Sequence, residues 1–167
     1  PVVPIPKGQD KKIACIVLNY KTGPMTDTLV NWLKNVETYK NKDIYVINNS
    51  EDPSCTTATH TLPENLKFTN GMTAGLEIAQ KEGDYDAYYF VCSDIDFNQG
   101  NDVLENLVRV MFSSDDIGVV SPQVNSFWGD HMAVSASDVD ERIWLEVTAT
   151  LYRKETIEKI GFWDKEL

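Results

Sequence analysis

Apolar residues along the chain fall into two kinds of segment that alternate. Short runs rich in β-branched and aromatic residues predict strands at 11–20, 43–48 and 85–92. Longer amphipathic or glycine-bounded segments predict helices at 26–37, 71–83 and 101–112. Strands that alternate with helices in this way predict an α/β fold with a mostly parallel central sheet flanked by helices.

Weaker signals complete the pattern. The remaining apolar runs predict strands at 66–68, 117–124 and 143–152, and a last helix that Gly161 closes. Asn101 is a good N-cap candidate for the helix that starts there. Prolines and a glycine predict an irregular lead-in over 1–10, and 11–167 is predicted to form a single domain.

Polar residues follow several of the predicted strands directly. These strand ends are Asn19-Tyr20, Asn48-Asn49-Ser50, Thr69-Asn70-Gly71 and Asp94-Ile95-Asp96. In parallel sheets, ligands bind beyond the carboxyl ends of the strands, so we expect these residues to converge on one edge. Each strand end also has an ordinary structural explanation, because asparagine and serine favour turns for local reasons.

Asp94 and Asp96 form the strongest chemical signal. If the strand continues through them, residues two apart point to the same face, and two neighbouring carboxylates repel unless a cation lies between them. Mg²⁺ and Mn²⁺ take oxygen ligands and typically bind through one or two carboxylates plus substrate phosphates. The alternative is a solvated acidic loop, which is common in an acidic chain.

Composition narrows the function classes. The formal net charge is −11, which disfavours nucleic acid and anionic membranes as partners. An acidic protein that handles a phosphorylated ligand needs a cation or backbone amides to do so. The apolar runs are all shorter than the roughly 20 residues of a membrane span, so we expect no transmembrane segment, and no signal peptide is visible.

Cysteine spacing argues against zinc. Cys15, Cys55 and Cys92 form no C-x-x-C motif, and both histidines are far from them in sequence. We therefore expect free thiols and a reducing, cytoplasmic location. The segment "GMTAG" is neither a dinucleotide-binding fingerprint nor a phosphate-binding P-loop.

Five motifs in order carry a family resemblance. They are "IVLNYKTG", "YVINNSED", "TNGMTAG", "VCSDIDFN" and "LYRKETIEKIGFWDKEL", which span residues 12–167. Together they resemble the nucleotide-sugar-dependent glycosyltransferases of the GT-A fold, in the inverting family 2, and its rhamnosyltransferase-like branch. The resemblance implies a Rossmann-like fold, Mn²⁺ or Mg²⁺ as cofactor, a UDP- or dTDP-sugar as donor, and a glycan or other hydroxyl compound as acceptor.

The resemblance also implies residue roles. Asp96 is expected to be a metal ligand, with Asp94 near the ribose or the metal, and the segment 144–148 is expected to face the acceptor. The nucleotide-sugar site is predicted to comprise Leu18, Asn19, Tyr20, Asn48, Ser50, Asp94, Ile95 and Asp96.

The chain departs from the family pattern in places that matter for catalysis. Asn48 stands where an acidic residue is common, and "LEIA" follows the glycine-rich segment in place of "N-x-G". The family's catalytic base usually lies shortly after the last motif. Either the domain is truncated and its base lies beyond Leu167, or its catalytic apparatus is unusual or incomplete. The alternatives to a glycosyltransferase are a nucleotide-sugar-binding module without transfer activity, and a receiver-type regulatory domain. The receiver hypothesis is disfavoured because receivers need an acidic pair after the first strand, where "LNYKTG" supplies no acidic residue.

Overall fold

The computed structural model describes residues 10–95, 97, 100–122 and 147–163. Its centre is a six-stranded sheet with the strand order β3-β2-β1-β4-β6-β5. In chain order the elements are β1 (Ile13–Asn19), α1 (Gly23–Asn35), β2 (Lys42–Asn48), β3 (His60–Thr61), α2 (Lys67–Glu82), β4 (Ala87–Cys92), α3 (Val103–Met111), β5 (Val119–Val120), β6 (Ala149–Arg153) and α4 (Lys154–Ile160).

The sheet is parallel on one side and antiparallel on the other. β1 pairs in parallel with both β2 and β4, and β2 pairs in parallel with β3. β6 runs antiparallel to both β4 and β5. The predicted α/β fold with a mostly parallel sheet is therefore confirmed, with an antiparallel extension at one side.

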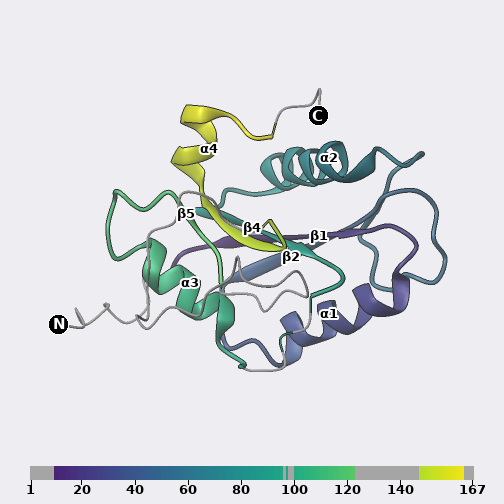
Figure 1. Ribbon diagram of the computed structural model, residues 1–167, viewed down its shortest axis with the longest axis horizontal. Helices are drawn as coiled ribbons and strands as arrows, with labels where there is room; N and C mark the ends of the chain where they lie inside the picture. Colours follow the sequence, from purple (N-terminus) through teal and green to yellow (C-terminus); the bar gives the residue numbers. More distant parts are fainter. Residues whose placement is uncertain (1–9, 96, 98–99, 123–146, 164–167) are drawn as a thin grey trace, which may run out of the picture.

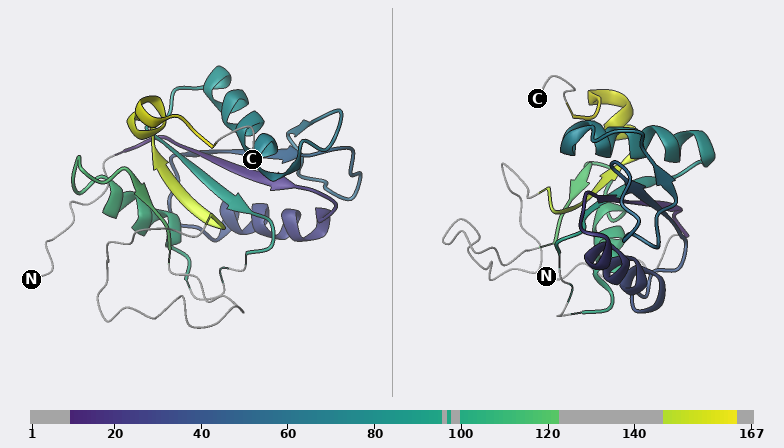
Figure 2. Two further views of the ribbon diagram at one scale, coloured as in Figure 1. Left: turned by 45° about the horizontal axis from the view of Figure 1, so that its top comes forward. Right: turned by 90° about the vertical axis from the view of Figure 1, so that its right-hand side faces the viewer.

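Helices cover both faces of the sheet. Figure 1 shows α2 and α4 on one face and α1 and α3 on the other, and Figure 2 shows the same layers from two further directions. All seven residues of β1 are buried, and their side chains alternate between the two faces. Ile13, Cys15 and Val17 pack towards α1 and α3, whereas Ile16 and Leu18 pack towards α2.

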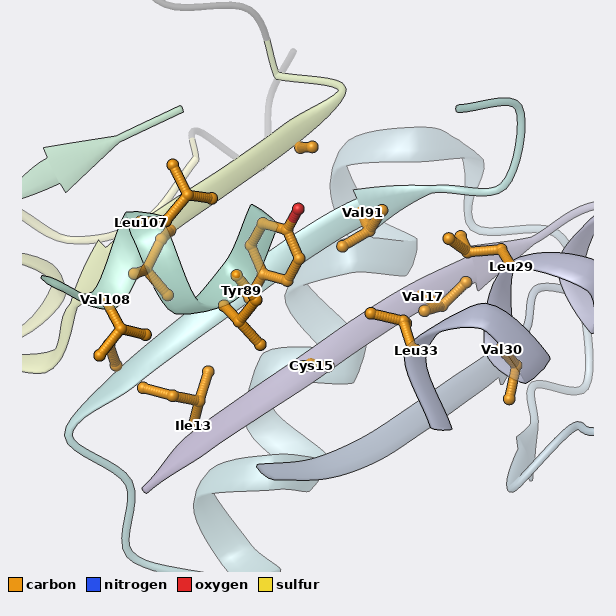
Figure 3. Close-up of a cluster of buried hydrophobic side chains, with 14 of the residues drawn as sticks. Ile13, Cys15, Val17, Leu29, Val30, Leu33, Tyr89, Val91, Leu107 and Val108 are labelled. Carbon is orange, nitrogen blue, oxygen red and sulfur yellow. The ribbon is translucent and has the colours of Figure 1, made fainter. Parts of the chain in front are cut away.

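The core beneath α1 and α3 explains why these helices form where they do. In Figure 3, Leu29 and Leu33 of α1 lie over one part of the sheet and Leu107 and Val108 of α3 over another, with Tyr89 of β4 between them. The helical spacing of these leucines and valines places them on one face of each helix. Each fully buried side chain of this kind contributes about 1.5–3 kcal/mol to folding.

Two expectations about the chain between β2 and β4 are wrong. The predicted strand at 66–68 is instead the start of α2, so the segment Thr69-Asn70-Gly71 lies in a helix and does not end a strand. A short run of apolar residues does not distinguish strand from helix without its tertiary contacts. The segment 55–65, for which the apolar pattern predicts no strand, also contains the two-residue strand β3, which pairs with the end of β2.

The predicted N-cap of α3 is also wrong. The helix begins after Asp102, whose side chain makes no capping hydrogen bond. The backbone amide of Leu104, in the first turn of α3, donates to the Glu37 carboxylate at 2.9 Å. Glu37 is fully buried just after the end of α1. A residue 67 positions away therefore caps this helix, which sequence-local capping rules cannot anticipate.

Other boundaries shift by a few residues. α1 begins at Gly23 and not at Thr26, with Pro24 in its first turn, where proline is well tolerated. Of the predicted strand 117–124, residues 123–124 lie outside the described residues, and β5 occupies Val119–Val120 of the remainder. Of the predicted strand 143–152, residues 143–146 lie outside the described residues, 147–148 form a turn, and β6 follows.

The last helix ends at Gly161, as predicted. Within the described part of the chain, no helix is both long enough and apolar enough to cross a bilayer.

Candidate functional site

The carboxyl ends of β1, β2 and β4 lie side by side. Asn19 is in register with Asn48, and Leu18 is in register with Cys92. Three of the four strand ends that were expected to converge, those after β1, β2 and β4, therefore do so. The fourth, Thr69-Asn70-Gly71, lies in α2. We call this row of strand ends, together with the loop 49–58 and the start of α2, the carboxyl edge.

A pocket of about 380 Å³ opens at the carboxyl edge, on the face of the sheet that α2 covers. It is lined by Leu18, Tyr20, Asn49, Asn65, Lys67, Phe68, Cys92, Ser93 and Asp94. Leu18, Tyr20 and Asp94 belong to the predicted site. Tyr20 is 42% exposed and Phe68 is 39% exposed, so aromatic surface is available to a ligand.

Asn19 and Asn48 support this edge from beneath and do not line the pocket. Asn19 Nδ2 donates to Asn48 Oδ1 at 2.8 Å and to Asp52 Oδ2 at 3.0 Å. Asn19 Oδ1 accepts hydrogen bonds from the hydroxyls of Thr22 and Thr26 at 3.1 and 2.8 Å. Both asparagines are buried, and their amides join β1, β2 and α1 into one network.

Close backbone packing completes the support. Thr22 Oγ1 lies 2.9 Å from Ser93 Oγ, which ties the start of α1 to the end of β4. A Cβ on Gly23 would lie 2.3 Å from the carbonyl carbon of Ser54 and 2.4 Å from the amide nitrogen of Cys55. Only glycine allows the loop after β2 to approach α1 this closely.

Asn49 positions the start of α2 beside the pocket. Its Oδ1 accepts from the Leu66 amide at 2.8 Å, and its Nδ2 donates to Asn65 Oδ1 at 3.0 Å and to the Lys67 carbonyl at 2.9 Å. A Cβ on Gly71 would lie 2.9 Å from both Asn49 Nδ2 and Leu18 Cδ1. These contacts bring Lys67 and Phe68 to the pocket, which the sequence did not reveal because this segment was predicted to be a strand.

The backbone is unusual at three positions of the carboxyl edge. Among the described residues, the non-glycine residues with positive φ are Lys21 (56°), Ser50 (114°) and Lys67 (62°). They follow β1, follow β2 and begin α2, respectively. Such conformations persist only where surrounding contacts impose them, and they concentrate at binding sites. Ser50 is half-buried and does not line the pocket.

Asp94 does not continue the extended geometry of β4. The strand ends at Cys92 and a turn follows, so extended geometry does not continue through Asp94. Asp94 is exposed where it lines the pocket, whereas Ile95 packs against the core on the side of α1 and α3. Asp96 lies outside the described residues, so its predicted role as a metal ligand stays a prediction.

The Cys92 thiol at the pocket is a poor nucleophile. Burial, together with the charge of Asp94, raises the pKa of the Cys92 thiol to about 12. The raised pKa favours the protonated thiol over the nucleophilic thiolate at neutral pH. All three cysteines are free, as expected.

The segment predicted to face the acceptor is described only at its end. Residues 144–146 lie outside the described residues. Val147 is 42% exposed, and the Thr148 carbonyl accepts from the Cys92 amide at 2.8 Å. The described end of this segment therefore lies next to Cys92 of β4, which lines the pocket, although Val147 and Thr148 do not line it themselves.

The missed pocket residues are Asn49, Asn65, Lys67, Phe68, Cys92 and Ser93. Asn49 belongs to the predicted strand end Asn48-Asn49-Ser50, and Cys92 and Ser93 directly precede the predicted end at Asp94, so strand position could have assigned all three to the site. Asn65, Lys67 and Phe68 reach the pocket through Asn49, a contact that no local pattern predicts.

Comparison with protein-family models gives no match, and no curated protein matches the sequence. A solved structure with a similar fold is the mannosyltransferase PcManGT from Pyrobaculum calidifontis in complex with GDP-Man and Mn²⁺. The TM-score is 0.73 and the identity 13%, over 99% of this chain and 51% of that chain. The chain thus spans about half the length of that protein. At this identity the comparison shows the fold alone, a Rossmann-like α/β fold that the chain shares with this mannosyltransferase and that agrees with the predicted fold class.

Proposed function

We propose that the chain is a metal-dependent glycosyltransferase domain that transfers a sugar from a nucleotide diphosphate sugar to a hydroxyl group. The observation that carries the proposal is the convergence of three strand ends and the start of α2 on one pocket. Ligands of parallel α/β sheets bind at this place. The shared fold of a mannosyltransferase that holds GDP-Man and Mn²⁺ supports the same reading.

The pocket residues suit the parts of such a donor. The exposed rings of Tyr20 and Phe68 offer flat apolar surfaces to a nucleobase or ribose. Lys67 provides a cationic group for the diphosphate in an otherwise acidic chain. UDP, dTDP and GDP are the candidate carriers, and the rhamnosyltransferase-like branch remains a prediction.

The oxygen ligands available at the pocket fit a hard divalent cation. Asp94 is a carboxylate with exposed oxygens, and Mg²⁺ or Mn²⁺ commonly binds through one or two carboxylates together with substrate phosphates. Among the described residues, no group of three or more acidic, histidine or cysteine side chains could hold a metal alone. Asp94, with Asp96 as a second ligand, would therefore share the ion with the diphosphate. A bound cation neutralises the charge of the leaving diphosphate.

Among the described residues that line the pocket, Asp94 is the one that carries a carboxylate. Because its proposed role is metal binding, no other carboxylate among these described residues is left to serve as the general base. This observation favours a second candidate function, a module that binds nucleotide sugars without transferring the sugar. Donor hydrolysis or sugar transfer by the purified chain would exclude the second candidate.

Titration calorimetry with UDP, dTDP and GDP, each with and without Mn²⁺, tests the proposal. We expect at least one nucleotide to bind, more tightly with Mn²⁺, and Asp94→Asn to weaken that binding by at least about tenfold. Asp116→Asn is the matched control, because Asp116 is exposed in the loop between α3 and β5 and does not line the pocket. Equal affinity with and without metal would contradict a metal-dependent site.

A further inference from the structure

The Phe68 side chain forms one wall of the pocket, but contacts within its own helix do not fix its orientation. It lies in the first turn of α2 and is 39% exposed. A side chain exposed to this extent at the end of a helix samples several rotamers unless another group holds it. Its contacts therefore decide whether the pocket presents a fixed aromatic surface.

Trp163 supplies that contact. The rings of Phe68 and Trp163 are stacked, with centroids 5.3 Å apart and planes at 27°. Trp163 in turn stacks on Phe162 at 4.6 Å and lies 5.9 Å from Phe90 of β4. Because Phe90 is fully buried, a continuous series of rings runs from the core of the sheet to the pocket.

The chain reversal after α4 places these rings. Gly161 has a φ of +81°, a backbone conformation that residues with a Cβ rarely adopt. A Cβ there would meet no atom within 4 Å. The glycine is therefore required for the backbone conformation and not for space. The reversal returns Phe162 onto Phe90, with centroids 4.5 Å apart, and Phe162 also meets Tyr152 edge to face.

We propose that Trp163 is a positioning residue that holds Phe68 as a fixed aromatic wall for the planar base of the donor nucleotide. One face of the Phe68 ring is stacked on Trp163, while the exposed part of the side chain lines the pocket. Fixing this ring before binding removes an ordering cost that the ligand would otherwise meet. The inference rests on the proposed function, because it assigns the occupant of the same pocket.

The test uses the nucleotide that binds the unmodified chain most tightly in the presence of Mn²⁺. Trp163→Ala is expected to weaken its binding about threefold to tenfold, and Trp163→Phe to restore most of the loss, because a ring is kept. The control is Phe112→Ala. Phe112 lies against Lys11 and Arg153, packs on the opposite face of the sheet, and does not line the pocket. It should leave nucleotide affinity unchanged while lowering stability as Trp163→Ala does.

A double-mutant cycle separates positioning from general destabilisation. If Trp163 acts through Phe68, the double variant Phe68→Ala/Trp163→Ala should bind no more weakly than Phe68→Ala alone. Losses that multiply would overturn the positioning role, and so would unchanged affinity in Trp163→Ala. Failure of every nucleotide to bind the unmodified chain would instead overturn the proposed function, and this role with it.

A spectroscopic readout works even if Trp163→Ala folds poorly. Nucleotide binding beside Phe68 should change tryptophan fluorescence in the unmodified chain, and most of that change should be absent in Trp163→Phe. An equal change in both proteins would place the responding tryptophan elsewhere and overturn the inference.

Discussion

The two ends of the parallel strands are built from different chemistry. At the amino ends, ion pairs join neighbouring strands and loops: Lys11–Asp86, Lys12–Asp43, Lys154–Asp84 and Arg153–Asp115. We call this row the amino edge. At the carboxyl edge, buried amides and hydroxyls around Asn19 do the joining, and the carboxylates of Asp52 and Asp27 there accept hydrogen bonds from neutral donors.

The difference has a physical reason. Ion pairs near water contribute little because solvent screens them, so the amino edge can lose any one of them at small cost. Buried amides that lose their partners are costly because nothing replaces the lost hydrogen bonds. The carboxyl edge is thus rigid beneath the pocket, and it leaves Asp94 and Lys67 available for a ligand.

The largest effect is expected for Asn19→Leu. The substitution removes the acceptor for the Thr26 hydroxyl and the amide donor to Asn48, both buried. We expect the free energy of unfolding to fall by about 3 kcal/mol, measured by urea denaturation. The control is Asn31→Leu, because Asn31 is an exposed residue of α1. Equal midpoints for the two variants would contradict a supporting role for the network.

A smaller effect is expected for Asp27→Asn, which tests how α1 holds the loop after β2. Both the amides and the hydroxyls of Thr56 and Thr57 donate to the Asp27 carboxylate. Partial burial acts to raise the pKa of Asp27, but these hydrogen bonds outweigh it and lower the pKa from 3.8 to about 2. Because solvent screens this partly exposed group, we expect Asp27→Asn to lower the free energy of unfolding by about 1 kcal/mol at pH 7, measured by urea denaturation.

The pH dependence of that loss has a definite sign. The folded pKa of Asp27 lies below its unfolded value, so its contribution is present in full above about pH 4 and disappears as the pH falls towards 2. Urea denaturation across this range should therefore show the difference between Asp27→Asn and the unmodified chain narrowing with acid. A constant difference would show that the carboxylate charge is not responsible.

The smallest effect is expected at the amino edge, for Lys154→Ala. The hydrogen bond and charge of Asp84 raise the pKa of Lys154, but the Asp84 side chain is 91% exposed. We expect no measurable change in the urea midpoint at low or high salt. A shift as large as that of Asp27→Asn would remove the distinction between the two edges.

Periodicity predicted the elements that bury long apolar faces. The sequence predicted the strands around Ile16, Val46 and Phe90 and the helix that carries Leu29 and Leu33, each to within a few residues of its bounds. Each of these segments buries one or both of its faces in the core, so the local apolar pattern and the tertiary structure agree.

Prediction failed where distant residues determine the local conformation. Asn49 directs residues 65–67 into α2, and Glu37 caps α3 from the end of α1. The expectation that Asn19 lines the pocket illustrates the same limit. Its position at a strand end was correct, but the side chain points into a buried network, on the opposite face from Leu18.

The sequence by itself determined the α/β class, the strands that form the parallel part of the sheet and the edge where their polar ends meet. These follow from apolar periodicity and from the rule that parallel strands end on one side. Only the tertiary structure decided that Lys67 and Phe68 reach the pocket and that Trp163 stacks on Phe68. Those contacts join residues far apart in the chain, and their geometry depends on packing across the sheet, which no local pattern encodes.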